Sequence, residues 1–121
     1  MSGNTAIFKE YGSDHEFTDP GDAAAIVPDR QRAVCPMVST VSAGETNTLP
    51  DPEFMGQELT ICFKTDGGDR VITAATGVNQ TGNNTLTFAD AGDMIALRAI
   101  QSGSSVVWRV MSNDGVALST V

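Results

Sequence analysis

A chain of 121 residues has room for one compact domain with a single hydrophobic core. Its 15 Asp and Glu outnumber 7 Lys and Arg, and the resulting charge of −8 repels phosphate backbones, so nucleic-acid binding is not expected. No apolar run approaches the roughly 18–20 residues of a membrane span, and the N-terminus lacks the pattern of a secretion signal, so we expect a soluble chain with no membrane partner.

The first 31 residues differ in composition from the rest of the chain. They contain the only His and the only Tyr, together with many of the acids. The large apolar residues in this stretch follow neither the helical nor the strand period: Ile7, Phe8, Tyr11 and Phe17. A segment of this kind buries too little apolar surface to fold alone. We therefore predict an extended N-terminal arm over residues 1–31, with these four side chains as candidate contacts to a partner.

From residue 32 onward, strand-like runs alternate with turn chemistry. Abundant Thr, Ser and Val and 12 glycines favour strands and turns over helices. The clearest alternation is in residues 58–64, whose Leu, Ile and Phe side chains share one face. The predicted strands are 32–41, 57–65, 70–75, 85–88, 94–100, 106–112 and 115–119. Their regular spacing predicts an all-β domain over residues 32–121, a small antiparallel β-sandwich or barrel-like domain.

Two features of this region predict specific connections. The sequence Asp66-Gly67-Gly68-Asp69 is typical of a hairpin turn and predicts that the strands on either side of it pair with each other. A faint similarity also relates the stretch around Gly56 to the stretch around Gly92. It indicates either a duplicated hairpin unit or chance similarity between short hairpins.

Side-chain chemistry for catalysis or metal binding is sparse. The only histidine, His15, lies in the predicted arm, where no Ser-His-Asp site is expected. Asp66 and Asp69 could in principle bind calcium, but their spacing lacks the pattern of an EF-hand loop, and a turn is the better interpretation. No glycine-rich phosphate loop occurs. We therefore expect a protein that is not an enzyme, with no catalytic residues, no metal site and no cofactor.

Cys35, Cys62 and Trp108 each allow more than one interpretation. Neither cysteine belongs to a CxxC pair, and buried free thiols fit assembly in a cytoplasm better than a disulfide or a metal site. Trp108 shares a strand face with Val106 and Val110, which favours a place in the core. An exposed Trp108 would instead indicate a carbohydrate-binding module.

Several short motifs between residues 48 and 118 resemble the β modules of tailed-bacteriophage head decoration and fibre proteins. The motifs are Gly56–Ile61, Ile72–Thr73, Thr85–Phe88, Ala91–Asp93 and Trp108–Val110. The resemblance implies a structural role and carries over no active-site residues. The length of the chain points to a head decoration, or cement, protein, because fibre proteins usually carry such a module within a longer chain.

This resemblance implies a location and partners. Decoration proteins bind the outside of the capsid, stabilise the shell, and sit as trimers at local threefold sites between hexamers of the major capsid protein. The expected partners are therefore the major capsid protein and further copies of this chain in a homotrimer, on the exterior of a virion assembled in the host cytoplasm. A fibre or tail-tip subunit that binds a host receptor is the nearer alternative, and a carbohydrate-binding module is the farther one.

Overall fold

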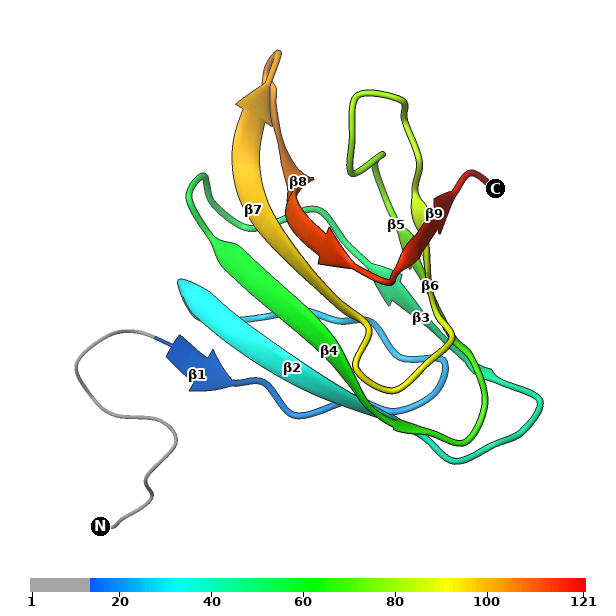
Figure 1. Ribbon diagram of the computed structural model, residues 1–121. Helices are drawn as coiled ribbons and strands as arrows, with labels where there is room; N and C mark the ends of the chain where they lie inside the picture. Colours follow the sequence, from blue (N-terminus) through cyan, green and yellow to red (C-terminus); the bar gives the residue numbers. More distant parts are fainter. Residues whose placement is uncertain (1–13) are drawn as a thin grey trace, which may run out of the picture.

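The computed structural model describes residues 14–121, and this part of the chain is made of β-strands, turns and loops (Figure 1). It forms a five-stranded sheet in the order β1-β2-β4-β7-β8 and a four-stranded sheet in the order β3-β5-β6-β9. The strands are β1 (Asp14–Glu16), β2 (Arg32–Ser39), β3 (Glu45–Leu49), β4 (Glu58–Asp66), β5 (Arg70–Ala74), β6 (Thr85–Phe88), β7 (Met94–Ser102), β8 (Ser105–Asp114) and β9 (Ala117–Ser119). The predicted all-β class is confirmed. Within these residues there is no helix long and apolar enough to cross a membrane.

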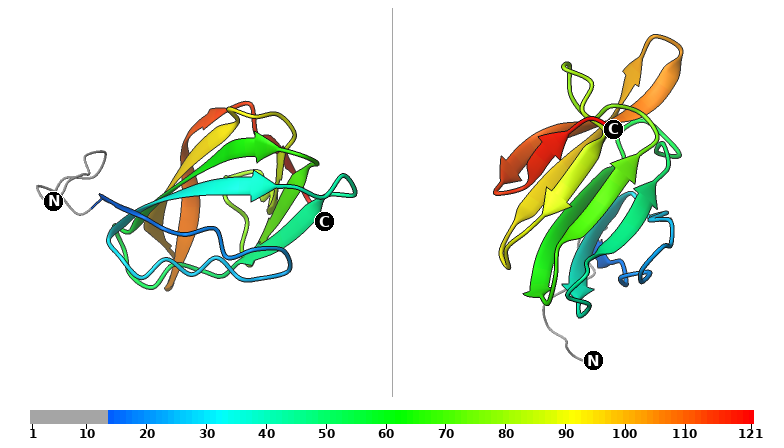
Figure 2. Two further views of the ribbon diagram at one scale, coloured as in Figure 1. Left: turned by 90° about the horizontal axis from the view of Figure 1, so that it is seen from below. Right: turned by 90° about the vertical axis from the view of Figure 1, so that its right-hand side faces the viewer.

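The hydrophobic core lies between the two sheets, which face each other (Figure 2). In β4, Leu59, Ile61 and Phe63 point into the core, and each such burial stabilises the fold by about 1.5–3 kcal/mol. Phe63 of the larger sheet meets Phe88 of the smaller sheet edge to face, with 6.1 Å between the ring centroids. Aromatic packing therefore joins the two sheets.

The first half of the domain is a stack of chain segments that each cross from one sheet to the other. β2 and β4 are parallel neighbours in the larger sheet, and β3 and β5 are parallel neighbours in the smaller one. The segment that contains β2 and β3 therefore lies along the segment that contains β4 and β5. A shorter layer precedes them, because β1 runs parallel to β2 and Ala25 bridges to Thr48 of β3. We call these three layers, residues 14–74, the parallel stack; β6 to β9 extend both sheets by antiparallel pairs.

Strand pairing is consequently mixed, whereas the sequence predicted an antiparallel domain. The connection at residues 66–69 is not a hairpin, because β4 and β5 belong to different sheets and do not pair. Nor do the stretches around Gly56 and Gly92 form a duplicated hairpin unit, since β7 and β8 pair within one sheet while β4 and β5 do not. The hairpin prediction at residues 66–69 was wrong because Asp and Gly residues are equally compatible with a hairpin turn and with a connection that crosses between sheets.

Gly67 and Gly68 are required by a close approach between two connections. Neither residue has a positive φ. A Cβ at Gly67 would overlap the carbonyl oxygen of Ser39, and one at Gly68 would overlap the carbonyl oxygen of Val41. The Gly67 N–H donates to the Ser39 carbonyl oxygen at 2.6 Å. The connection from β4 to β5 is therefore packed directly on the connection from β2 to β3.

Residues 14–31, which the sequence analysis places in the arm, pack against the rest of the domain. The Phe17 N–H donates to the carbonyl oxygen of Val34 at 2.8 Å, and Ile26 is fully buried. This packing was not predicted because an extended chain held by single contacts has no hydrophobic period. β3 was also missed, since Glu45 and Asn47 occupy two of its inward positions. The folded part of the chain therefore begins before residue 32.

Replacing Gly68 with Ala tests the packing of the two connections. We expect the free energy of unfolding to fall by about 1–3 kcal/mol, because the added Cβ overlaps the backbone at Val41. Asp66→Ala is the control on the same connection, and its exposed side chain predicts a change of less than about 0.5 kcal/mol. Urea denaturation measures both variants. Equal stabilities would contradict the close approach.

Candidate functional site

One buried arginine ties the N-terminal part of the described chain to the sandwich. Arg70 opens β5, and its side chain points inward together with the alternate residues Ile72 and Ala74. The Arg70 side chain is fully buried. A buried guanidinium is costly unless its charge is paired and its N–H donors have acceptors. The partners of Arg70 therefore determine what must pack around it.

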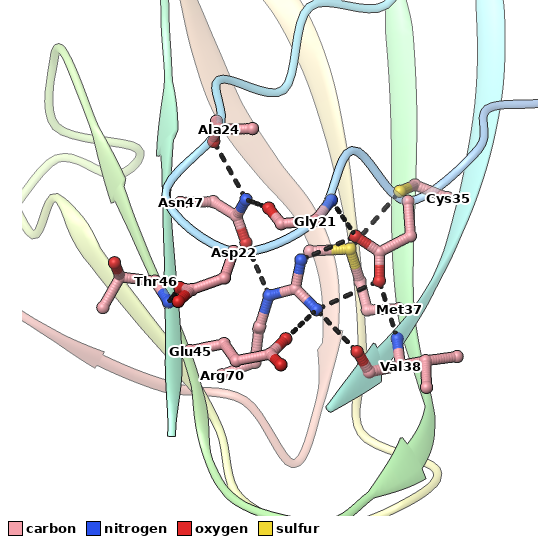
Figure 3. Close-up of polar contacts among 11 residues, drawn as sticks. Gly21, Asp22, Ala24, Cys35, Met37, Val38, Glu45, Thr46, Asn47 and Arg70 are labelled. Carbon is pink, nitrogen blue, oxygen red and sulfur yellow. Dashed lines mark hydrogen bonds and ion pairs between the residues drawn. The ribbon is translucent and has the colours of Figure 1, made fainter. Parts of the chain in front are cut away.

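Arg70 forms a two-point ion pair with Asp19. It also reaches Val38 of β2 and Glu45 and Asn47 of β3 (Figure 3). Its Nη2 lies 2.6 Å from Asp19 Oδ1, and its Nη1 lies 3.0 Å from Asp19 Oδ2. Nε donates to Asn47 Oδ1 at 2.5 Å, and Nη1 also donates to the Val38 carbonyl oxygen at 2.9 Å. Glu45 Oε1 is 3.2 Å from Nη1. We call Arg70, Asp19, Glu45 and Asn47 the arginine clamp.

Further hydrogen bonds hold the same segment on β3 (Figure 3). The Asn47 side-chain amide donates to the carbonyl oxygens of Gly21 and Ala24, at 2.8 and 2.9 Å. Asp22 Oδ1 accepts the Thr46 N–H at 2.8 Å. Residues 19–24 are therefore fixed by side chains at both ends, although they form no strand.

The Asp19 carboxylate is stabilised in its charged form. Burial by itself raises the pKa of Asp19, but hydrogen bonds from Arg70 and from the N–H groups of Val38 and Gly21 outweigh that effect. The pKa of Asp19 is therefore lower than its usual value of 3.8. The side-chain N–H groups of Arg70 and Asn47 named above donate to acceptors within the protein. The chemical role of the clamp is therefore to hold residues 19–24 in place. Within residues 14–121, no cluster of His, Cys, Asp and Glu is arranged to hold a metal ion.

The predicted contact residues all precede this segment in the sequence. Ile7, Phe8 and Tyr11 lie outside the described residues. Phe17 is half-buried and packs against the core, so much of its ring is unavailable to a partner. The fixed segment thus determines where the chain that precedes Asp14 joins the domain.

Trp108 and the cysteines take up ordinary structural positions. Trp108 is 2% exposed, and its Nε1 donates to the Pro50 carbonyl oxygen at 3.0 Å, so the core interpretation is confirmed. Both cysteines are free thiols, with Cys35 buried and Cys62 half-buried. Burial raises the pKa of Cys35 to about 12, which leaves the thiol unreactive at neutral pH.

The arginine clamp was not predicted from the sequence. One signal for it was present, because Arg70 alternates with Ile72 and Ala74 and therefore had to face the core. Its partner could not be identified in the same way, because Asp19 lies 51 residues earlier in a segment without a period. No protein family matches the chain, and no curated protein matches its sequence.

Replacing Asp19 with Ala should lower the free energy of unfolding by about 3 kcal/mol, because Arg70 then keeps a buried charge with one carboxylate fewer. Asp29→Ala is the matched control. Asp29 contacts Arg30 at 3.7 Å in an exposed ion pair, for which we expect a loss below about 1 kcal/mol. Urea denaturation followed by tryptophan fluorescence measures both. Similar losses in the two variants would contradict the clamp.

The clamp should also make stability depend on pH. The unfolded chain takes up a proton on Asp19 near its usual pKa of 3.8, whereas the folded chain takes it up only at lower pH. The unfolded state binds more protons in that interval, so this contribution is complete well above 3.8 and is lost as the pH falls through the folded pKa. As the pH is lowered, the melting temperature should therefore fall more in the wild type than in Asp19→Asn, whose side chain takes up no proton in this pH range. Parallel pH profiles for the two proteins would contradict this.

Proposed function

We propose that the protein is a structural component of a bacteriophage virion that binds the outer surface of the capsid and stabilises the shell. The observation that supports this most is the arginine clamp, which fixes residues 19–24 on the parallel stack. An arm can hold a neighbouring subunit only if the point where it joins its own domain withstands the load. The clamp strengthens this point for the chain before Asp14, because a two-point ion pair with the buried Arg70 fixes the segment that follows β1.

The pairing of β1 with β2 also suits an N-terminal arm that is pulled by its attachment to a shell. β1 runs parallel to β2, and the Phe17 N–H continues this pairing. A force along β1 therefore acts on its hydrogen bonds to β2 together and not one after another. Behind them, Asp19 must separate from Arg70 before the segment can leave the domain. Attachment through the N-terminal arm is thus compatible with resisting outward pressure on a shell.

The proposed partners are the major capsid protein and two further copies of the chain, on the exterior of the virion. The larger sheet ends in β1 and β8 and the smaller sheet ends in β9, whereas residues 22–26 already cover β3; edge strands are commonly covered by association. Each contact with the shell needs to contribute only a few kcal/mol, because contacts at symmetry-related sites add together. This role requires no cofactor.

A fibre or tail-tip subunit is the nearer alternative, and it would occur in few copies per virion. The farther alternative, a carbohydrate-binding module, needed an exposed Trp108 to stack on a sugar. The indole is 2% exposed, so that interpretation lacks its binding residue. Capsid attachment is the function we favour.

Deleting residues 2–13 tests attachment through the arm. The deletion leaves Asp19 and Ile26 in place, so we expect the melting temperature of the full chain to be kept. Binding to expanded capsids stripped of decoration proteins should weaken by about tenfold or more, because apolar anchors are lost. Co-sedimentation measures the affinity, and binding of the full chain should weaken with salt if its charge of −8 meets a basic shell.

Light scattering on the free protein and a reconstruction of decorated capsids give the stoichiometry, for which we expect three copies per site. Full-length protein that fails to bind any stripped capsid of its source phage would contradict the proposed function. Unchanged affinity after deletion of residues 2–13 would instead place the whole attachment in the β domain.

A further inference from the structure

An exposed apolar patch lies on the connection between β3 and β4. Phe54 is 41% exposed and Met55 is 62% exposed, although both are large apolar side chains. Their neighbour Glu53 lines a small hollow together with Val27 of the segment before β2, which is 47% exposed. We call Phe54 and Met55 the loop patch. Exposed apolar residues that gather in one place commonly mark a binding surface.

One buried side chain fixes the connection that carries the loop patch to the segment before β2. Gln57 is fully buried, and its Nε2 donates to the carbonyl oxygens of Pro28 and Arg30, both at 3.0 Å. Its Oε1 accepts the N–H of Glu53 at 3.0 Å. A surface held in shape before binding loses little conformational entropy when a partner docks. The loop patch is thus prepared for a contact.

The connection that carries the loop patch leads into β4 at the end of the larger sheet where β1 and β2 also start (Figure 1). Asp14 pairs with Arg32, and Arg32 pairs with Glu58, so β1, β2 and β4 all start at this end. Met55 precedes Glu58 closely in the sequence, which places it beside these strand starts. The 13 residues before Asp14 therefore join the domain near the loop patch.

Acidic residues accompany the apolar ones. Asp51 and Glu53 are exposed and precede Phe54 on the same connection. An apolar centre with a charged rim is the usual anatomy of a protein interface. The complementary partner is an apolar depression bordered by Lys or Arg, because opposite charges at the rim favour docking.

We propose that the loop patch is the contact of the β domain itself with the capsid shell, and that Phe54 and Met55 enter an apolar depression with a basic rim. This inference rests on the proposed function. It adds the loop patch, on the connection into the start of β4, to the attachment proposed for the N-terminal arm. The strand starts of β1, β2 and β4 then face the shell, and the opposite end faces solvent.

The double variant Phe54→Ser/Met55→Ser tests the proposal, with Met111→Ser as the matched control. Met111 is also 62% exposed, but it lies on β8, which is separated from β4 by β7 in the larger sheet. We expect the double variant to bind stripped, expanded capsids about tenfold more weakly or worse, and the control to stay within about twofold of the wild type. Melting temperatures should agree with the wild type, since these side chains are exposed.

Three outcomes would overturn the inference in distinguishable ways. If the wild type binds capsids and the double variant binds equally well, the loop patch is not the contact, while the proposed function stands. A double variant with a smaller mass in light scattering would show that the patch joins copies of this chain instead. A wild type that binds no shell would remove the proposed function, and this inference with it.

Discussion

The charge of Arg70 inside the protein is the constraint on which the parallel stack depends. Its partners come from every layer: Asp19 from the first, and Glu45 and Asn47 from the second, while Arg70 itself belongs to the third. Pairing one charge therefore aligns three segments that are far apart in the sequence. Apolar substitutes for a buried ion pair are often no less stable. We infer that the main contribution of the clamp is this alignment, which apolar side chains would leave less defined.

Local sequence patterns predicted most strands but not their partners. Alternation located β4 and β7 because one face of each strand is buried. β3 was not predicted because Glu45 and Asn47 occupy inward positions where a recognisable strand would have apolar residues. The sequence does not distinguish the crossing at residues 66–69 from a hairpin. Its glycines are required by a contact with Ser39 and Val41, and a local sequence pattern carries no information about that contact.

The sites were predictable only in outline. The inward position of Arg70 followed from alternation, but the identity of its partner Asp19 depends on tertiary packing. Phe54 and Met55 stand between turn residues in the sequence and have no period, so their exposure became visible only in the folded chain. Extended segments held by side chains are the parts of this fold that periodicity does not detect.

The layered arrangement also affects when the chain can fold. Each parallel pair closes a long loop, and the contact between Asp19 and Arg70 spans 51 residues, so chain entropy is lost before the pairing can compensate for it. During synthesis, the Asp19 carboxylate has only backbone N–H groups as partners until its ion-pair partner Arg70 has left the ribosome. We therefore expect residues 19–24 to be fixed on the stack only after β5 is complete, and this segment of a nascent chain to stay accessible to chaperones or proteases until then.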